Sequence, residues 1–334
     1  MAQQADVRHD FHVYCDNRHR SLNRCLDLRG GMDSVSRQVR CCEGESMDAT
    51  VKEFLARRQA SWHRSHIYFQ ELWNGYLSAG LANKHFVSEL TSGSDPKFAQ
   101  RVWEMRLARH LKACGHNITS QSEGEPDFRF EQDGVVVWVE AVSPECGGDL
   151  SRATPTNDMT SLQQQILLRW TTALDAKWKK GIEYRQKGVV KPEDAYVIAI
   201  DGSQLGRLPL AHGASRRPYI VEAVFAVGPL AFIFDTEIGR LGGTTNTVRF
   251  ETENRNKALV RTEAFLNPVY AGVSGVITCV PPMFSEAILP IQVAYNPLAD
   301  IALQPGVFGP SAEEWTAELV GTDAEGQDWD LKRL

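Results

Sequence analysis

The feature that most constrains the fold is the dipeptide Asp133-Gly134, which stands between two runs rich in apolar residues. This dipeptide favours the tight turn of a β-hairpin, because both central positions of that turn need positive φ angles. We therefore expect two strands, at 127–131 and 135–142, paired antiparallel across the turn.

The register of this hairpin follows from the turn. With a two-residue turn, Gln132 faces Val135, and each step outward keeps the sum of the paired residue numbers constant. Asp127 then lies opposite Glu140. Directly opposed β-carbons are about 5 Å apart, so the two carboxylates repel each other unless a cation lies between them.

Side chains alternate between the two faces of a strand. One face of the hairpin is apolar and is expected to face the core; it consists of Phe128, Phe130, Val135, Val137, Val139 and Ala141. The other face is expected to be solvent-accessible; it consists of Asp127, Arg129, Glu131, Val136, Trp138 and Glu140. Carboxylate oxygens together with a backbone carbonyl, here that of Ala141, favour Mg²⁺ or Mn²⁺ over zinc.

A helix is expected before the hairpin. Asp95 can cap it, Pro96 suits its first position, and Gly115 supplies a left-handed stop. Glu104 lies beside the apolar stripe of this helix, where a carboxylate is unusual unless it has a partner.

The segments Gly-Glu-Pro-Asp-Phe at 124–128 and Val-Trp-Val-Glu-Ala-Val at 137–142 resemble the PD-(D/E)XK nuclease superfamily. The resemblance implies a restriction-endonuclease-like core, of α/β (α+β) class, with a mixed central sheet flanked by helices. It implies that Asp127 and Glu140 bind metal. Glu104 would hold the metal through water or accept a hydrogen bond from a lysine. The resemblance covers about a third of the chain.

The family's lysine, two residues after the strand acid, is replaced here by Val142. Some members take this lysine from the following helix, which is expected over 161–187. We assign the role to Lys177, with Arg169 or Gln165 as a neighbour that positions the phosphate or the lysine. Arg169 and Lys177 project within about 80° of each other on a helix. A solvated basic helix face is the alternative.

These roles imply metal-dependent hydrolysis of phosphodiester bonds by an endonuclease, in defence or repair, with DNA favoured over RNA. The cofactor would be Mg²⁺ or Mn²⁺, which lowers the pKa of bound water and neutralises phosphate charge. The alternative is a degenerate member of the fold that binds nucleic acid or a protein partner without cutting, since Val142 cannot carry charge. A homodimer is left open.

The rest of the chain divides by composition. Residues 1–46 hold four of the seven cysteines and show no periodicity, which favours a disordered or non-native extension over a zinc site. A helical segment at 47–90 precedes the nuclease-like core at 91–210. A β-rich part at 211–310, which includes an expected strand at 220–227, would pack on the core. Residues 311–334 would form a peripheral acidic tail.

Composition narrows the class of protein. The chain has 334 residues and a formal net charge of −6, which argues against wholesale coating of nucleic acid but not against a local basic groove. The longest apolar runs, at 195–200 and 229–234, are too short to span a bilayer. Residues 1–46 lack the apolar centre of a secretory signal. We therefore expect a cytoplasmic protein without a membrane partner.

Overall fold

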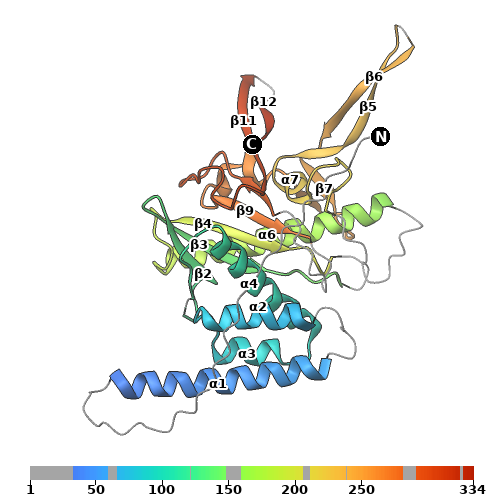
Figure 1. Cartoon of the computed structure of the whole chain (residues 1–334). Helices are drawn as coiled ribbons and strands as arrows, with labels where there is room; N and C mark the ends of the chain where they lie inside the picture. The colour runs from blue at the N-terminus through green and yellow to red at the C-terminus, as the bar shows by residue number, and fades with distance from the viewer. Residues whose placement is uncertain are drawn as a thin grey trace, which may run out of the picture. The chain divides into compact units, whose positions relative to one another are not determined.

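A mixed sheet of eight strands lies at the centre of the computed structural model (Figure 1). Its order is β1-β2-β3-β4-β9-β10-β11-β12, and two further pairs, β5-β6 and β7-β8, form separate two-stranded sheets. The pairs β3-β4, β4-β9 and β10-β11 are parallel, and the other neighbours in the central sheet are antiparallel. The strands are β1 (Thr119–Ser120), β2 (Phe128–Gln132), β3 (Val135–Val142), β4 (Ala195–Asp201), β5 (Val227–Asp235), β6 (Arg240–Val248), β7 (Glu251–Glu253), β8 (Leu259–Arg261), β9 (Gly275–Cys279), β10 (Gln292–Tyr295), β11 (Glu313–Asp323) and β12 (Gly326–Arg333).

The structure describes residues 33–58, 66–120, 122–147, 159–205, 211–237, 239–280, 291–323 and 326–334. Gly44–Leu334 forms one compact unit, to which the following description applies. The helices are α1 (Asp33–Arg58), α2 (His66–Ser78), α3 (Lys84–Leu90), α4 (Asp95–Ala113), α6 (Met159–Gln186), α7 (Tyr219–Val224) and the short 3₁₀ turns η1 (Ala264–Leu266) and η2 (Pro268–Tyr270).

The β2-β3 hairpin has the register that the turn predicts. Gln132 pairs with Val135, and the pairing continues without a bulge to Phe128 and Val139. Asp133 and Gly134 have φ angles of 51° and 80°, so both central positions are left-handed, as a type I′ turn requires. The local turn chemistry therefore sets which residues of the two strands oppose each other.

Both faces of β3 and β4 are buried, because helices cover each of them. Val137, Val139 and Ala141 belong to one apolar cluster, together with residues of α2, α3 and α4. Trp138 belongs to a second cluster, together with residues of α6 and α7. The expectation that the second face of the hairpin is solvent-accessible is wrong for Trp138 and Glu140, which are buried under α6. Glu131 is exposed, and Asp127, Arg129 and Val136 are partly exposed.

Helix α4 lies where a helix was expected before the hairpin, but its N-cap residue differs from the expected Asp95. Ser94 occupies the N-cap position, with Asp95 inside the first turn, and no side chain makes a capping hydrogen bond there. Gly115 has a φ angle of 90°, which is the left-handed stop that the sequence predicts. The indole of Trp103 then anchors the helix to the sheet by donating to the carbonyl of Ala199 at 3.1 Å.

The C-terminal part of the chain differs most from expectation. Residues 311–334 do not form a peripheral tail, because β11 and β12 extend the central sheet from β10. The strands β9 and β10 likewise lie within that sheet, and are not a separate layer packed on the core. The segment at 220–227, expected to be a strand, is largely the helix α7.

The expected boundary between the N-terminal extension and the helical segment, at residue 46, also differs from the structure. Helix α1 begins at Asp33, so the expected limit at residue 46 falls inside a helix. Residues 1–32 lie outside the described part of the chain. Among the helices that the structure describes, none combines the length and the apolarity needed to cross a membrane.

The Asp133-Gly134 turn gives a first testable prediction. In Gly134→Ala the new β-carbon meets no atom within 4 Å, so the cost is one of backbone conformation alone. A non-glycine residue in the left-handed region costs about 1–2 kcal/mol, and we expect the free energy of unfolding to fall by that amount. Urea denaturation measures it.

The matched control is Gly75→Ala, in the middle of helix α2, where a β-carbon also meets no atom within 4 Å. Alanine is favoured over glycine in a helix by about 1 kcal/mol, so this change should leave stability unchanged or raise it. Equal effects of the two substitutions would contradict the turn assignment.

Candidate active site

Acidic side chains gather where β3 reaches its carboxyl end. Asp127 directly precedes β2, and its Oδ2 accepts a hydrogen bond from the backbone N–H of Ala141 at 2.7 Å. Counted outward from the turn, Phe128 and Val139 are the last regular pair of the two strands, so Asp127 lies just beyond the paired region. This bond therefore fixes the carboxylate of Asp127 against β3, next to Glu140.

Glu140 is buried, with 6% of its surface exposed, and both carboxylate oxygens have partners. The ammonium of Lys177, from α6, donates to Oε1 at 2.6 Å. The hydroxyl of Tyr184, two turns further along α6, donates to Oε2 at 3.0 Å. A buried carboxylate needs such compensation, since an unpaired buried charge is strongly destabilising.

Glu104 reaches the same region from α4, on the other face of the sheet. It is 2% exposed, and Arg101 donates to both of its oxygens, at 2.8 and 2.7 Å. Arg101 also pairs with Glu89. The expected hydrogen bond from Lys177 to Glu104 is replaced by this pairing, because Lys177 lies on the α6 side and bonds to Glu140.

Gln100 connects α4 to the end of β3. Its side-chain amide donates to Glu104 at 2.9 Å and to the carbonyl of Ala141 at 3.3 Å. Its oxygen accepts from the backbone N–H of Ser143 at 2.7 Å. The hydroxyl of Ser143 donates to Asp201 at the end of β4, so a polar network joins the ends of both parallel strands.

The carboxylates affect one another electrostatically. Burial raises the pKa of Asp127 well above its usual range, and Glu104 and Glu140 raise it further, whereas Lys177 lowers it. Burial also raises the pKa of Glu104; Arg101 opposes the shift and Glu140 adds to it. In their ionised forms the three acids would thus outnumber their two basic neighbours, and the raised pKa values follow from this.

This excess of negative charge suits a divalent cation. Within the described ranges, no group of three or more His, Cys, Asp or Glu side chains could hold a metal ion. Mg²⁺, however, is commonly bound by one or two carboxylates and keeps several waters. Asp127, Glu140 and the carbonyl of Ala141 form such a smaller donor set, so their chemistry fits Mg²⁺ or Mn²⁺.

The other residues expected in the site are not brought to the carboxylates by any contact among the described residues. The guanidinium of Arg169 lies against Gly147, where a β-carbon would come within 2.1 Å of it. The amide of Gln165 donates to Ser161, one turn away, at 3.3 Å. Val142 packs against the apolar cluster on the α6 side.

Three residues of the cluster were absent from the sequence prediction. Gln100 and Arg101 precede Glu104 by four and three residues, a spacing that places them beside it on a helix. Tyr184 follows Lys177 by seven residues, so it shares a helix face with it. Helical spacing from the predicted residues was therefore the signal that could have found them.

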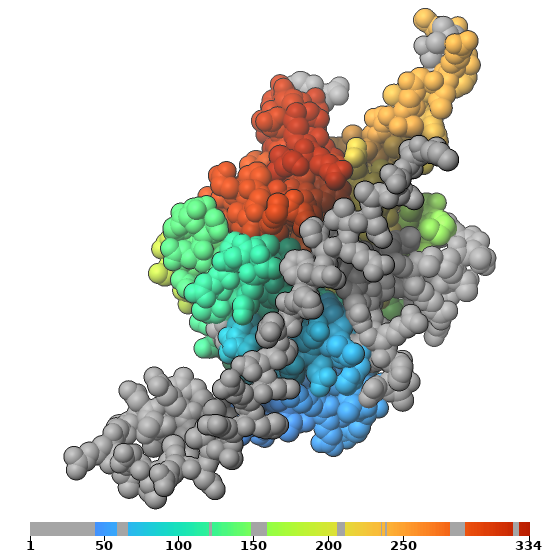
Figure 2. All heavy atoms as spheres, viewed as in Figure 1, coloured from blue at the N-terminus to red at the C-terminus, as the bar shows by residue number. Residues whose placement is uncertain are grey.

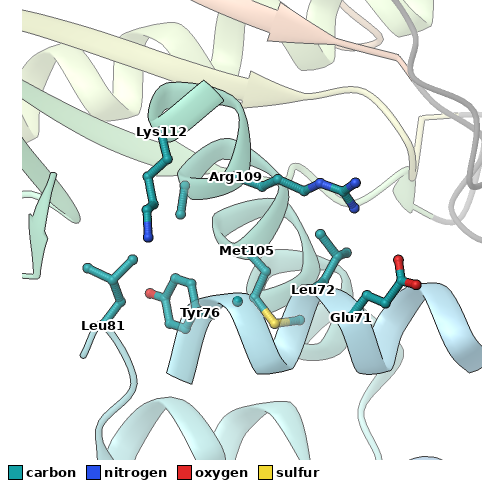
Figure 3. Close-up of a pocket in the computed structure, with 9 residues that line it drawn as sticks. Glu71, Leu72, Tyr76, Leu81, Met105, Arg109 and Lys112 are labelled. Atoms are coloured by element: carbon teal, nitrogen blue, oxygen red, sulfur yellow. The ribbon is translucent and has the colours of Figure 1, made fainter. Parts of the chain in front are cut away.

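A cavity of about 330 Å³ lies between α2 and α4 (Figure 3). Its lining includes Tyr76 and Met105, together with the basic side chains of Arg109 and Lys112 and the acidic Glu71. Burial raises the pKa of Tyr76, and Glu104 and Asp127 raise it further. The charges of the two carboxylates thus act on Tyr76, but none of the acids of the cluster lines the cavity.

Comparisons with protein-family models, with curated proteins and with solved structures found no match to this chain. The functional interpretation therefore depends on the geometry and charge of the cluster itself.

The raised pKa of Asp127 predicts the direction of a stability change with pH. Such a carboxyl binds its proton more tightly in the folded state than in the unfolded state. Stability therefore falls as the pH rises from about 4, the unfolded value, through the folded pKa. Asp127→Asn removes the charge and keeps an oxygen for the Ala141 N–H. Without divalent metal, we expect this variant to melt at a higher temperature than the wild type at about pH 8.

The difference in melting temperature should shrink as the pH falls toward about 4, where the wild-type carboxyl is protonated as well. The control is Asp328→Asn, at an exposed position of β12. Its effect on stability should be small, as for most exposed surface substitutions. A constant difference for Asp127→Asn would contradict the buried, coupled state of this carboxyl.

Proposed function

We propose that this chain is a Mg²⁺- or Mn²⁺-dependent nuclease with a restriction-endonuclease-like core, similar to the PD-(D/E)XK superfamily. One observation carries the proposal: the ammonium of Lys177 lies 2.6 Å from the carboxylate of Glu140, which neighbours Asp127 at the same strand end. Two acids and a lysine thus meet although the strand position expected for the lysine holds Val142.

The residues have distinct roles in this proposal. Asp127, Glu140 and the carbonyl of Ala141 would hold the metal, which lowers the pKa of bound water and neutralises charge on the scissile phosphate. Lys177 would place positive charge where the phosphate gains negative charge in the transition state. Glu104 would orient the metal's water shell.

The surroundings of the cluster support a polyanionic substrate. Arg109 and Lys112 bring positive charge to the cavity between α2 and α4, the helix that also carries Glu104. Such side chains can contact phosphates along a strand and fix its register. Of the two nucleic acids, DNA is proposed ahead of RNA, in a cytoplasmic protein.

A second candidate function is nucleic-acid or protein binding without cleavage. It is favoured by the fact that both oxygens of Glu104 and both oxygens of Glu140 already accept hydrogen bonds from side chains. A metal must then displace Lys177 or share Glu140 with it.

Cleavage of plasmid and single-stranded DNA in the presence of Mn²⁺ or Mg²⁺ tests the nuclease proposal. Asp127→Asn and Glu140→Gln should each lower the cleavage rate about 100-fold or more, since each weakens the binding of the metal. Lys177→Met should lower it by a similar factor, since it removes positive charge beside the phosphate. EDTA should abolish cleavage in the wild type.

The control is Lys179→Met on the same helix, since Lys179 is 64% exposed and pairs only with Asp175 among the described residues. It should cleave like the wild type. A wild-type protein that binds DNA in a salt-sensitive way but does not cleave it under any of these conditions would instead support the second function.

A further inference from the structure

The hairpin formed by β5 and β6, called here the β5-β6 arm, extends away from the central sheet (Figures 1 and 2). Five large apolar side chains on it are exposed to solvent: Val248 near its base and four nearer its tip. Phe232 is 66%, Ile233 50%, Phe234 61% and Leu241 61% exposed. Apolar side chains gathered this way mark an interaction site more often than an ordinary surface.

The strand pairing sorts these side chains onto two faces. Phe232 pairs with Thr244, and Phe234 pairs with Leu241 across a bulge. Because directly paired residues share a face and successive residues alternate, Phe232, Phe234 and Leu241 lie on one face. Ile233 lies on the opposite face, where it pairs with Gly243. Phe232, Phe234 and Leu241 thus form an apolar patch on one face of the arm, beside Thr244.

A buried polar network anchors the base of the arm. Glu222 in α7 is 1% exposed, pairs with Arg249 at 2.7 Å, and accepts from the backbone N–H of Ser215 at 2.7 Å. The side chain of Asn246, in β6, donates to the carbonyl of Ser215 at 3.0 Å. The arm is therefore held firmly at its base while its apolar face stays uncovered.

The arm lacks the contacts that usually stabilise a two-stranded sheet. Among the described strands, neither β5 nor β6 pairs with a third. An isolated two-stranded hairpin is at best marginally stable in water, and a second apolar layer is the usual remedy. We therefore expect a partner surface to pack on the arm as its second apolar layer.

Charge indicates the class of partner. Residues 227–248 contain two acids, Asp235 and Glu237, and one base, Arg240, so the segment has a net charge of −1. The whole chain has a net charge of −6. With a single base, the arm offers little positive charge to a nucleic-acid backbone or an acidic lipid surface, whereas an apolar protein surface needs none.

We propose that the apolar face of the β5-β6 arm packs against the same face of a second copy of this chain, related by a twofold axis. Two such sheets stack about 10 Å apart, with the side chains of the inner faces interdigitating. A twofold interface is self-complementary, so one apolar face suffices for both copies. The dimer does not depend on the proposed nuclease activity.

The exposed area sets the strength of this dimer. A phenylalanine can bury about 150–250 Å², so Phe232, Phe234 and Leu241, at their exposures, offer roughly 400 Å² per copy. The pair then buries about 800 Å² before the backbone and neighbouring side chains are counted, below the roughly 1,200 Å² of a standard interface. The dimer should therefore dissociate on dilution, at micromolar concentrations.

Sedimentation velocity of the full chain from about 1 to about 200 µM tests the proposal. We expect the wild type to shift from monomer to dimer over this range. The double variant Phe232→Ser/Phe234→Ser should raise the dissociation constant at least about 10-fold. Leu241→Ser, on the other strand of the same face, should weaken the dimer as well.

The matched control is Ile233→Ser, which removes a similar apolar side chain from the opposite face of the same strand and should leave dimerisation unchanged. Far-ultraviolet circular dichroism checks that each variant is folded, and Leu241→Ser serves if the double variant is not. A wild type that stays monomeric at every concentration overturns the proposal. Dimerisation that is sensitive to Ile233→Ser but not to Leu241→Ser overturns it too.

Discussion

The structure depends on the compensation of buried negative charge at the carboxyl end of β3. Glu140 is buried there and is stable only because Lys177 and Tyr184, both from α6, bond to its two oxygens. Glu104 is buried on the other side of the sheet and relies on Arg101 in the same way. The helices α4 and α6 thus each supply both apolar packing and the partner of one buried acid, which links their position to the chemistry of the site.

Asp127 differs from the other two acids. Among the described residues its carboxylate bonds only to the backbone N–H of Ala141, so no cation is paired with it directly. The pKa of Asp127 is raised because burial and the two neighbouring carboxylates disfavour its charged form and no directly paired cation in the described part of the chain offsets them. The place of uncompensated charge in the cluster is therefore the place where a cation would add most stability, and this is the physical basis of the proposed metal site.

Several parts of the fold and of the site were predictable because they depend on neighbours in the sequence. The turn at Asp133-Gly134 set the register of the hairpin, and this register put Asp127 beside the strand end that carries Glu140. Helical spacing singled out Lys177, which the structure brings to Glu140. The burial of the acid-bearing face was not predictable, because it results from α6 packing on β3, and strand alternation cannot show whether a polar face is covered.

The sequence by itself determined the turn, the pairing of β2 with β3 and the acidic pair, since turn geometry and side-chain alternation act over only a few residues. Only the tertiary structure decided that β9 to β12 continue the same sheet, that Gln100 joins α4 to Ala141, and that the apolar arm stands free of the core. These features depend on contacts between residues far apart in the chain. The free energy of such contacts comes from burial and charge pairing in three dimensions, which no local pattern encodes.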